Sequence, residues 1–286
     1  MSLAKVPVSL IVPCKNEEEN LERCLKSVPW VCESFVVDSQ SADKTEEIAT
    51  ACGAQVVQFK YQGGWPKKKN WALDNLPFEN EWVLILDADE CLPPEAEEEI
   101  RAIVEDQDEP HAGYWINRRY FFMGRPLKHA YFPNWNLRLF KHRLGRYEKI
   151  TEKETDSGDH EIHEHVVVNG STGKLKSVMD HHAFPTIEGF VEKHNRYSNW
   201  EAVVESAGKD EVASLQHRGV KGKRLLRRVF RKLPFRPTLR FLYVYLWQKG
   251  LLDGWPGYVF ARLHAQYEFL SVAKAKERSR RAKESR

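Results

Sequence analysis

Two aspartates and a glutamate come directly after an apolar stretch of the sequence. Residues 82–86 read Trp-Val-Leu-Ile-Leu, and Asp87, Asp89 and Glu90 follow them. Two carboxylates one residue apart at the end of a strand can share one hard divalent cation, Mg²⁺ or Mn²⁺, and leave coordination positions open for phosphate oxygens. Taken alone, such a pair is more often an acidic loop, so its interpretation depends on its neighbours.

Another carboxylate comes at the end of a second predicted strand. Asp38 follows the apolar residues 35–37, and Asp43 lies five residues further on. In nucleotide-binding α/β folds, a carboxylate at this place accepts hydrogen bonds from a ribose or a base edge. The alternative is that the side chain caps the next helix, and this suits Asp43 better than Asp38.

Three consecutive lysines add positive charge near these carboxylates. Residues 65–70 read Trp-Pro-Lys-Lys-Lys-Asn and lead into a predicted helix, whose N-terminus and lysines would both favour a diphosphate. A solvated surface segment is the competing interpretation. The chain contains neither GxxxxGK[ST] nor GxGxxG, which argues against P-loop and dinucleotide-binding proteins. Together, the carboxylates and lysines predict a site for a nucleoside diphosphate bridged by a metal ion.

Alternating strands and helices must position these groups. The predicted strands are residues 8–12, 34–38, 55–59 and 81–87, and the predicted helices between them are 16–28, 42–52 and 67–76. Asn16 is placed to cap the first helix. This alternation is typical of an α/β fold with a mostly parallel sheet flanked by helices, which binds ligands at the carboxyl ends of its strands. Asp38 and Asp87 both lie at such ends.

The composition is that of a globular protein with unevenly distributed charge. The 286 residues are 42% hydrophobic and 12% aromatic, which argues against disorder, and five cysteines without CxxC spacing argue against a disulfide framework or structural zinc site. No apolar stretch approaches the length of a membrane span, and the N-terminus lacks the layout of a signal peptide, so we expect a cytoplasmic protein. The net charge of +3 combines −12 over residues 1–216 with +15 over residues 217–286.

Four ordered motifs carry a resemblance to a known family. They read Val-Ser-Leu-Ile-Val-Pro-Cys-Lys-Asn-Glu-Glu from residue 8, Val-Asp-Ser-Gln-Ser-Ala-Asp from residue 37, Lys-Asn-Trp-Ala-Leu-Asp from residue 69 and Trp-Val-Leu-Ile-Leu-Asp-Ala-Asp-Glu from residue 82. Through them, residues 6–92 resemble the inverting glycosyltransferases of family 2, and within that family the lipopolysaccharide-core β-glucosyltransferases of the WaaE type. The resemblance implies a GT-A fold, in which a mostly parallel, Rossmann-like sheet is flanked by helices. It also implies a hexosyltransferase that uses a UDP-sugar, Mg²⁺ or Mn²⁺, and a glycan or lipid-linked acceptor.

The resemblance implies functions for individual residues. Asp89 would ligate the metal ion directly, and Asp87 would contact the ribose and the water shell of the metal. The residues that would bind the nucleotide sugar are Pro13, Asn16, Glu17, Asp38, Lys69 and Asn70, with Asp38 on the base or ribose. Gln40 stands where the family often has glycine, and residues 65–68 replace a glycine-rich segment. These departures leave the identity of the donor open.

An inverting transfer needs a carboxylate base that deprotonates the acceptor hydroxyl opposite the leaving group. Position-matching to the family makes Glu164 the candidate, with Glu90 as the alternative and Glu161 as a third. A surface ion pair is the competing interpretation of Glu164. His181 would be an additional ligand to the metal or diphosphate, and Arg138 would contact either phosphate or a structural partner.

The C-terminal region mixes cations with apolar side chains. Residues 221–240 are rich in arginine and lysine and lead into the aromatic residues 241–247. This combination suits an anionic membrane surface, although packing of the aromatic residues on the catalytic domain explains it as well. No nucleic-acid motif accompanies the charge, so nucleic acid is not an expected partner.

The predicted organisation is a catalytic domain followed by a basic, mainly helical extension. The catalytic domain covers residues 1–208, with a nucleotide-binding half at 1–92 and an acceptor half at 93–208, and the extension covers residues 209–286. We expect a protein of the cytoplasm, peripheral on the inner membrane.

Two other functions fit part of the pattern. A nucleotidyltransferase that makes nucleotide sugars needs a glycine-rich loop with arginine and lysine after its first strand, and residues 13–18 do not provide one. A non-catalytic GT-A-like membrane adaptor would not need Asp87 and Asp89, which are both present. The sequence therefore favours a metal-dependent inverting glycosyltransferase.

Overall fold

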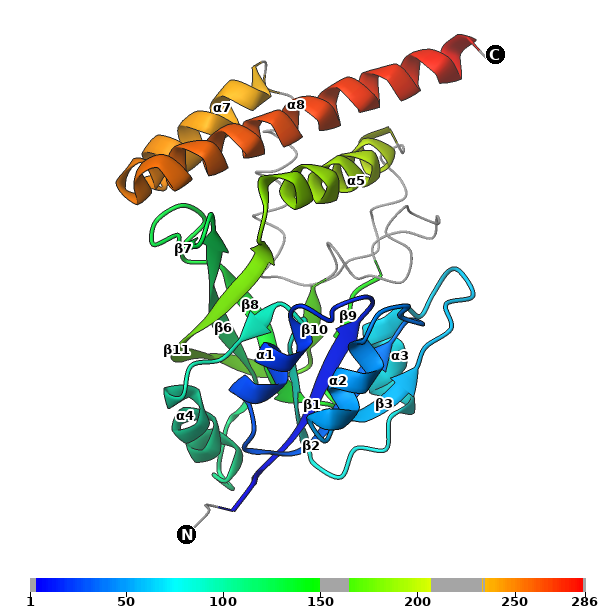
Figure 1. Ribbon diagram of the computed structural model, residues 1–286, viewed down its shortest axis with the longest axis vertical. Helices are drawn as coiled ribbons and strands as arrows, with labels where there is room; N and C mark the ends of the chain where they lie inside the picture. The colour runs from blue at the N-terminus through cyan, green and yellow to red at the C-terminus, as the bar shows by residue number, and fades with distance from the viewer. Residues whose placement is uncertain (1–3, 150–164, 207–232, 234, 285–286) are drawn as a thin grey trace. The chain divides into compact units, whose positions relative to one another are not determined.

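The computed structural model describes residues 4–149, 165–206, 233 and 235–284, which belong to two compact units (Figure 1). Among these residues, the first unit contains 4–120, 133–148 and 165–183, and the second contains 121–132, 149, 184–206, 233 and 235–284. The boundary expected at residue 208 lies outside the described residues.

One half of the central sheet of the first unit is parallel. In the order β3-β2-β1-β4, its strands are β3 (Gln55–Gln58), β2 (Val31–Asp38), β1 (Val6–Cys14) and β4 (Trp82–Ile85). The helices that connect them are α1 (Leu21–Ser27), α2 (Thr45–Ala51) and α3 (Lys68–Asn75). The strand–helix alternation predicted from the sequence is therefore confirmed.

Antiparallel strands complete the sheet beyond β4. They are β8 (Trp135–Lys141), β6 (His111–Phe122), β11 (Ser171–Phe184) and the short β5 (Glu90–Cys91), followed along the chain by helix α4 (Glu95–Val104). A separate pair is formed by β9 (Gly145–Tyr147) and β10 (Val166–Val168). The result is the mixed, helix-flanked sheet of a GT-A-like fold, as expected.

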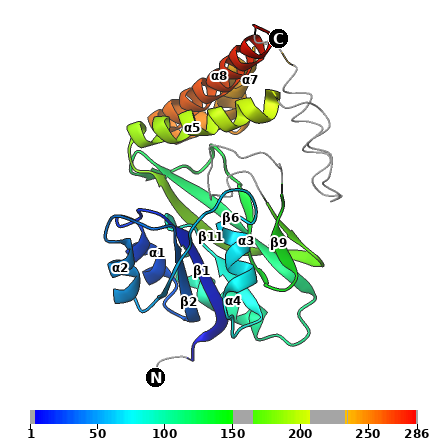
Figure 2. The ribbon, with the colours of Figure 1, turned by 90° about the vertical axis from the view of Figure 1, so that its right-hand side faces the viewer.

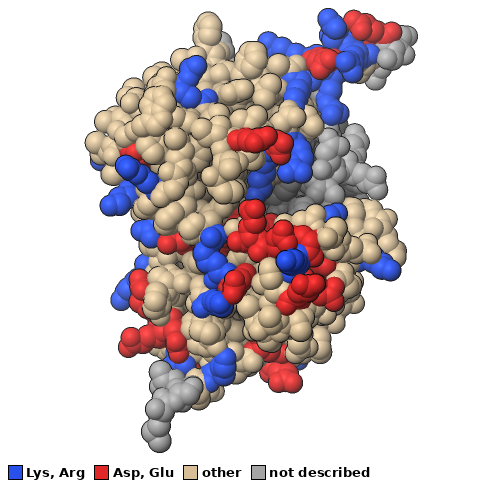
Figure 3. All heavy atoms as spheres, in the orientation of Figure 1, with Lys and Arg blue, Asp and Glu red and all other residues tan. Residues whose placement is uncertain are grey.

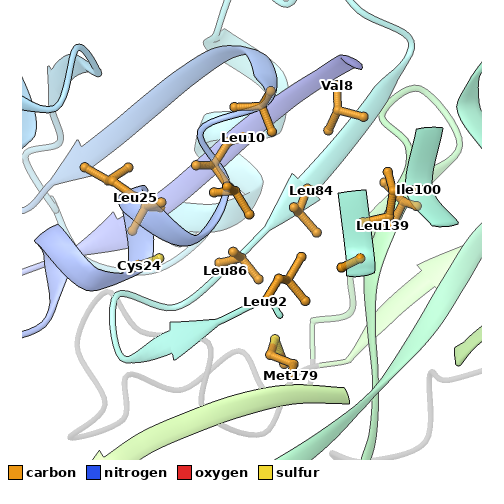
Figure 4. Close-up of a cluster of buried hydrophobic side chains, with 14 of the residues drawn as sticks. Val8, Leu10, Cys24, Leu25, Leu84, Leu86, Leu92, Ile100, Leu139 and Met179 are labelled. Atoms are coloured by element: carbon orange, nitrogen blue, oxygen red, sulfur yellow. The ribbon is translucent and has the colours of Figure 1, made fainter. Parts of the chain in front are cut away.

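Successive side chains of β1 point to opposite faces of the sheet, and each face has its own apolar core. Leu10 belongs to one core together with Leu84, Leu25 of α1 and Ile100 of α4 (Figure 4). Ile11 belongs to the second core, which includes Ala72 and Leu73 of α3. Figure 2 accordingly shows α1 and α2 on one side of the parallel strands and α3 on the other.

The second unit is helical. Its elements are α5 (Ile187–Ser206), α7 (Arg236–Leu242), the π-helical η1 (Tyr243–Trp247), the 3₁₀ turn η2 (Gly250–Asp253) and α8 (Gly254–Glu284). The strand β7 (Arg125–Pro126), paired with the end of β6, also belongs to it. Aromatic rings join these elements: Phe190 of α5 packs edge-on against Phe122 and Phe260. In the described parts of the chain, no helix is both long and apolar enough to cross a bilayer.

One expected helix start is wrong. The first helix begins at Leu21 rather than after Asn16, and Asn16 has a left-handed backbone with φ of 55°. Its side-chain oxygen accepts the N–H of Ala42, in the loop after β2, at 2.8 Å. A long-range contact therefore replaces the local cap.

The substitution Leu84→Ala tests the first core. Leu84 is fully buried, so its truncation leaves a cavity and should lower the free energy of unfolding by about 2–5 kcal/mol. Leu144→Ala is the control, because that leucine is 38% exposed and should change stability by only about 0.5 kcal/mol. Urea denaturation followed by circular dichroism measures both, and equal losses would contradict the assignment of Leu84 to the core.

Candidate active site

The carboxyl ends of the parallel strands bring the predicted carboxylates to one edge of the sheet. Cys14, at the end of β1, is in register with Asp38 at the end of β2. On the other side of β1, Asp87 follows the last residue of β4 by two positions. Both aspartates lie at strand ends, where the sequence predicted them.

Two cations hold the Asp87 carboxylate. The Lys69 Nζ lies 2.8 Å from Oδ1, and the Arg138 Nη2 lies 2.6 Å from Oδ2. Partial burial would by itself raise the pKa of Asp87, but Arg138 and Lys69 outweigh it and hold that pKa well below its usual range. The side chain is still 32% exposed, so this carboxylate is ionised and open to a ligand.

Glu90 is fully buried and binds two arginines. Its Oε1 accepts hydrogen bonds from Arg118 at 3.1 Å and from Arg138 at 2.5 Å, and its Oε2 accepts the N–H of Asp87 at 3.0 Å. Burial alone would lower the pKa of Arg138, but the charges of Asp87 and Glu90 outweigh this effect and hold the pKa well above its usual value. Glu90 therefore fixes Arg138 against Asp87.

Asp89 lies beside His181 because β5 pairs with β11. The pairing sets Glu90 opposite His181, and the N–H of His182 donates to the Asp89 carbonyl at 2.8 Å. As a result, the Asp89 Oδ1 is 3.1 Å from the His181 Nε2. The ring of Tyr120 packs on His181 with centroids 4.9 Å apart, which fixes the imidazole.

The Asp89 and His181 atoms suit a divalent cation. Carboxylate oxygens suit Mg²⁺ and Mn²⁺, and imidazole is a common metal ligand. Two ligands about 2.1 Å from one ion, in adjacent octahedral positions, lie about 3 Å apart, as these two atoms do. The described residues hold no group of three or more His, Cys, Asp or Glu side chains arranged for a metal.

Asp38 is almost fully buried and holds the loop that follows β2. Its Oδ2 accepts the N–H of Ser41 at 3.0 Å and the Nε2 of Gln58 at 3.0 Å, and its Oδ1 accepts the Ser41 hydroxyl. Asp43 accepts the N–H of Thr45 at 3.1 Å in the turn before α2, but the N-cap residue of this helix is Lys44, so the capping interpretation of Asp43 is wrong.

The loops after β1 and β2 are hydrogen-bonded to each other. The N–H of Asn16 donates to Ser41 Oγ and the N–H of Glu17 donates to Thr45 Oγ1, each at 2.8 Å. Pro13, one residue before the end of β1, is in register with Val37. Acidic side chains gather over α1, α2 and these loops in Figure 3, and the exposed ones are Glu18, Glu19, Glu22, Glu46 and Glu47.

The three lysines at the start of α3 are buried rather than solvated. Lys67, Lys68 and Lys69 are 7%, 1% and 7% exposed, so the interpretation as a surface segment is wrong. The Lys68 Nζ donates to the carbonyl of Cys14 at 2.8 Å, and the Asn70 amide donates to and accepts from the backbone of Tyr147, both at 2.9 Å. The three lysines are therefore buried cations, whereas the acidic side chains over α1 and α2 are exposed to solvent.

The structure adds two residues that the sequence did not single out. Arg118 donates to the hydroxyl of Tyr120 at 2.9 Å. Arg118 also pairs with Glu90, and the ring of Tyr120 packs on His181. They lie two residues apart on β6, and this spacing places them on one face of a strand. The candidates Glu164 and Glu161 lie outside the described residues.

Known proteins share this sequence pattern. The model of glycosyl transferase family 2 matches residues 9–165. The lipopolysaccharide core biosynthesis glycosyltransferase LpsC of Rhizobium meliloti is 29% identical over 290 residues, which cover 96% of this chain and 94% of that protein. An uncharacterized glycosyltransferase of Rickettsia typhi is 28% identical over 281 residues, covering 95% of this chain and 87% of its own.

Among solved structures, a mannosyltransferase from Pyrobaculum calidifontis, in complex with GDP-Man and Mn²⁺, superposes with a TM-score of 0.48 at 14% identity, covering 95% of this chain and 87% of that one. The match to the family model extends over more than half of the chain. The protein is therefore a member of glycosyl transferase family 2.

Proposed function

We propose that the protein is a metal-dependent inverting glycosyltransferase that transfers glucose from UDP-glucose to a glycan or lipid-linked acceptor such as lipopolysaccharide core. The observation that carries this proposal is the arrangement at the end of β4. There, the ionised Asp87 lies between Lys69 and Arg138, and Asp89 lies 3.1 Å from His181. Carboxylates for a metal and cations for a diphosphate are the groups that nucleotide-sugar chemistry requires.

Asp89 and His181 would hold Mn²⁺ or Mg²⁺, with Asp87 in contact with the water shell of the ion or with the ribose. A cation bound there supplies charge that stabilises the departing diphosphate. Lys69 would bind the diphosphate together with the start of α3, and Arg138 would orient Asp87. Glu90, which holds both arginines, is in this proposal a positioning residue rather than the base.

The nucleoside would bind over the loops after β1 and β2. Asp38 would shape this pocket by fixing Ser41, with Pro13, Asn16 and Glu17 along its wall. Asn70 would act indirectly, because its amide holds the backbone of Tyr147. The remaining catalytic group is the base, for which Glu164 is our candidate.

The acceptor class is supported by likeness to a relative over nearly the whole chain. The Rhizobium meliloti protein is named for lipopolysaccharide core biosynthesis, and the alignment covers 96% of this chain. A lipid-linked acceptor of this kind places the reaction at a membrane surface, on its cytoplasmic side where nucleotide sugars are available.

Asp89→Asn tests the metal site. We expect UDP to bind wild-type protein more tightly with Mn²⁺ than without it, and the variant to lose more than about 100-fold in that affinity, because even outer partners of a metal site contribute about 10–100-fold. Asp180→Asn is the matched control, since Asp180 neighbours His181 but pairs with Arg119. Calorimetric titration with UDP and GDP measures these affinities. Unchanged Mn²⁺-dependent binding in Asp89→Asn would refute the metal assignment, and a preference for GDP would refute the UDP-sugar donor.

Glu164→Gln tests the base. Loss of a general base should reduce kcat for glucosyl transfer by about 10²–10⁴-fold and leave UDP binding intact. Glu161→Gln is the paired variant and should retain turnover. Transfer of radiolabelled glucose from UDP-glucose to isolated lipopolysaccharide core provides the assay, and full activity of Glu164→Gln would rule this residue out.

Glu90→Gln separates positioning from catalysis. Removing the charge leaves Arg118 and Arg138 buried with less compensation, so we expect the free energy of unfolding to fall by about 3–5 kcal/mol. Glu22→Gln, which alters an exposed ion pair with Lys26 on α1, should leave the melting temperature unchanged. A Glu90→Gln protein with wild-type stability and no transfer activity would instead identify Glu90 as the base.

A further inference from the structure

The second unit exposes large apolar side chains where α7 is joined to α8. We call these residues the α7–α8 tip: Leu242, Tyr243, Leu246, Trp247, Leu251, Leu252, Trp255 and Tyr258. Trp247 is 80% exposed, Trp255 is 66% exposed and Leu252 is 58% exposed. So much exposed tryptophan and leucine on one contiguous segment is unusual for a surface that contacts only water.

Hydrogen bonds and close backbone packing fix the backbone of the tip. Both carboxylate oxygens of Asp253 accept backbone N–H groups, from Lys128 at 2.9 Å and from Ala130 at 2.7 Å. Gly257 lets the first turn of α8 pack directly on the carbonyl of Gly250, where a Cβ atom would clash. The apolar side chains therefore project from a fixed turn.

Aromatic contacts hold part of the tip in place. The rings of Trp255 and Tyr258 stack with centroids 5.4 Å apart, and Tyr258 also packs edge-on against Phe241 and Tyr245. Val244, on the inner side of η1, is fully buried. One side of this segment thus supplies the packing, and the other side presents its side chains outward.

The charges around the tip have one sign. Between residues 235 and 270, the exposed charged side chains are those of Lys249 and Arg262. The two acidic residues in this segment are engaged: Asp253 binds the backbone, and Glu268 pairs with Arg236 at 2.6 Å and Arg240 at 3.2 Å. In Figure 3, the surface around the junction of α7 and α8, at the upper left, is mostly uncharged, with lysine and arginine at its margin.

We infer that the α7–α8 tip docks on an anionic lipid bilayer. Tryptophan and tyrosine favour the interface between headgroups and acyl chains, since their rings are apolar and their N–H or O–H groups remain hydrogen-bonded to water and headgroups. Leucines reach the acyl region, and flanking cations bind acidic headgroups. The absence of an exposed carboxylate in residues 235–270 removes the repulsion that an anionic surface would otherwise meet.

The far end of α8 is also basic, but it begins about 25 Å along the helix from the tip, beyond the range of screened charges, so it adds little to the attraction at the tip. Residues 271–284 of α8 carry six lysines and arginines against two glutamates. The α7–α8 tip is inferred to be a docking surface from its own residues. Its role, which is to bring the enzyme to a lipid-linked acceptor, rests on the proposed function.

Paired substitutions test the docking surface in the full-length protein. Trp247→Ser with Trp255→Ser removes two exposed rings. Ile187→Ser with Val191→Ser is the matched control, because these α5 residues are 44% and 40% exposed and lie outside the tip. Flotation with vesicles of phosphatidylethanolamine and phosphatidylglycerol, and with vesicles of phosphatidylcholine, gives the fraction of protein bound.

We expect the wild-type protein to bind the phosphatidylglycerol vesicles more strongly than the phosphatidylcholine vesicles. The tryptophan pair should lower the partition coefficient by about tenfold or more, because each buried indole contributes a large apolar area. The control pair should bind like wild type, and all proteins should bind UDP equally, since the substitutions lie outside the nucleotide site.

Three results would overturn the inference: no vesicle binding by wild type, equal losses in the two paired variants, or a wild-type dimer that the tryptophan substitutions convert to monomer. Light scattering after size-exclusion chromatography identifies the last of these, in which a second copy covers the tip. Vesicle binding without UDP binding would refute the proposed function alone, so the two failures are distinguishable.

Discussion

The buried ion pairs of Glu90 are the interaction on which the arrangement of the site depends. Glu90 is fully buried and binds Arg118 and Arg138, and Arg138 in turn binds Asp87. These residues come from β5, β6, β8 and the end of β4. Because removing one partner from a buried ion pair costs about 3–5 kcal/mol, strands distant in sequence are constrained to meet in this register. The carboxylates proposed to bind the metal and ribose are therefore held before any ligand arrives.

The network also distributes charge in a way that suits the proposed reaction. Lys69 and Arg138 compensate the charge of Asp87, which lies close in sequence to the carboxylates of Asp89 and Glu90. Exposed acidic side chains lie over α1 and α2, and the lysines at the start of α3 are buried. In our proposal, a diphosphate would gain from these buried cations, whose fields are little weakened by water.

The helical unit combines a packed interior with an apolar surface, and these have separate origins. Aromatic rings of α5 and α8, among them Phe190 and Phe260, fill the interior. The carboxylate of Asp253 accepts a backbone N–H, and that of Glu268 pairs with an arginine, both within the unit. The α7–α8 tip therefore exposes cations and tryptophans but no carboxylate. A lipid-linked acceptor and a lipid-binding surface would complement each other, since confining enzyme and acceptor to one plane raises their encounter frequency.

Local sequence patterns are enough to predict the parallel strands, the helices between them and the positions of Asp38 and Asp87 at strand ends. Periodic apolar residues specify these features locally, whatever the rest of the chain does. The contacts that individual side chains make depend instead on the folded chain. Asn16 bonds to the loop after β2 instead of capping a helix, Lys68 is buried, and Arg118 joins Glu90. The folded chain also leaves Trp247 exposed rather than packed in the core. Each outcome depends on a partner far away in sequence, and local periodicity carries no information about such partners.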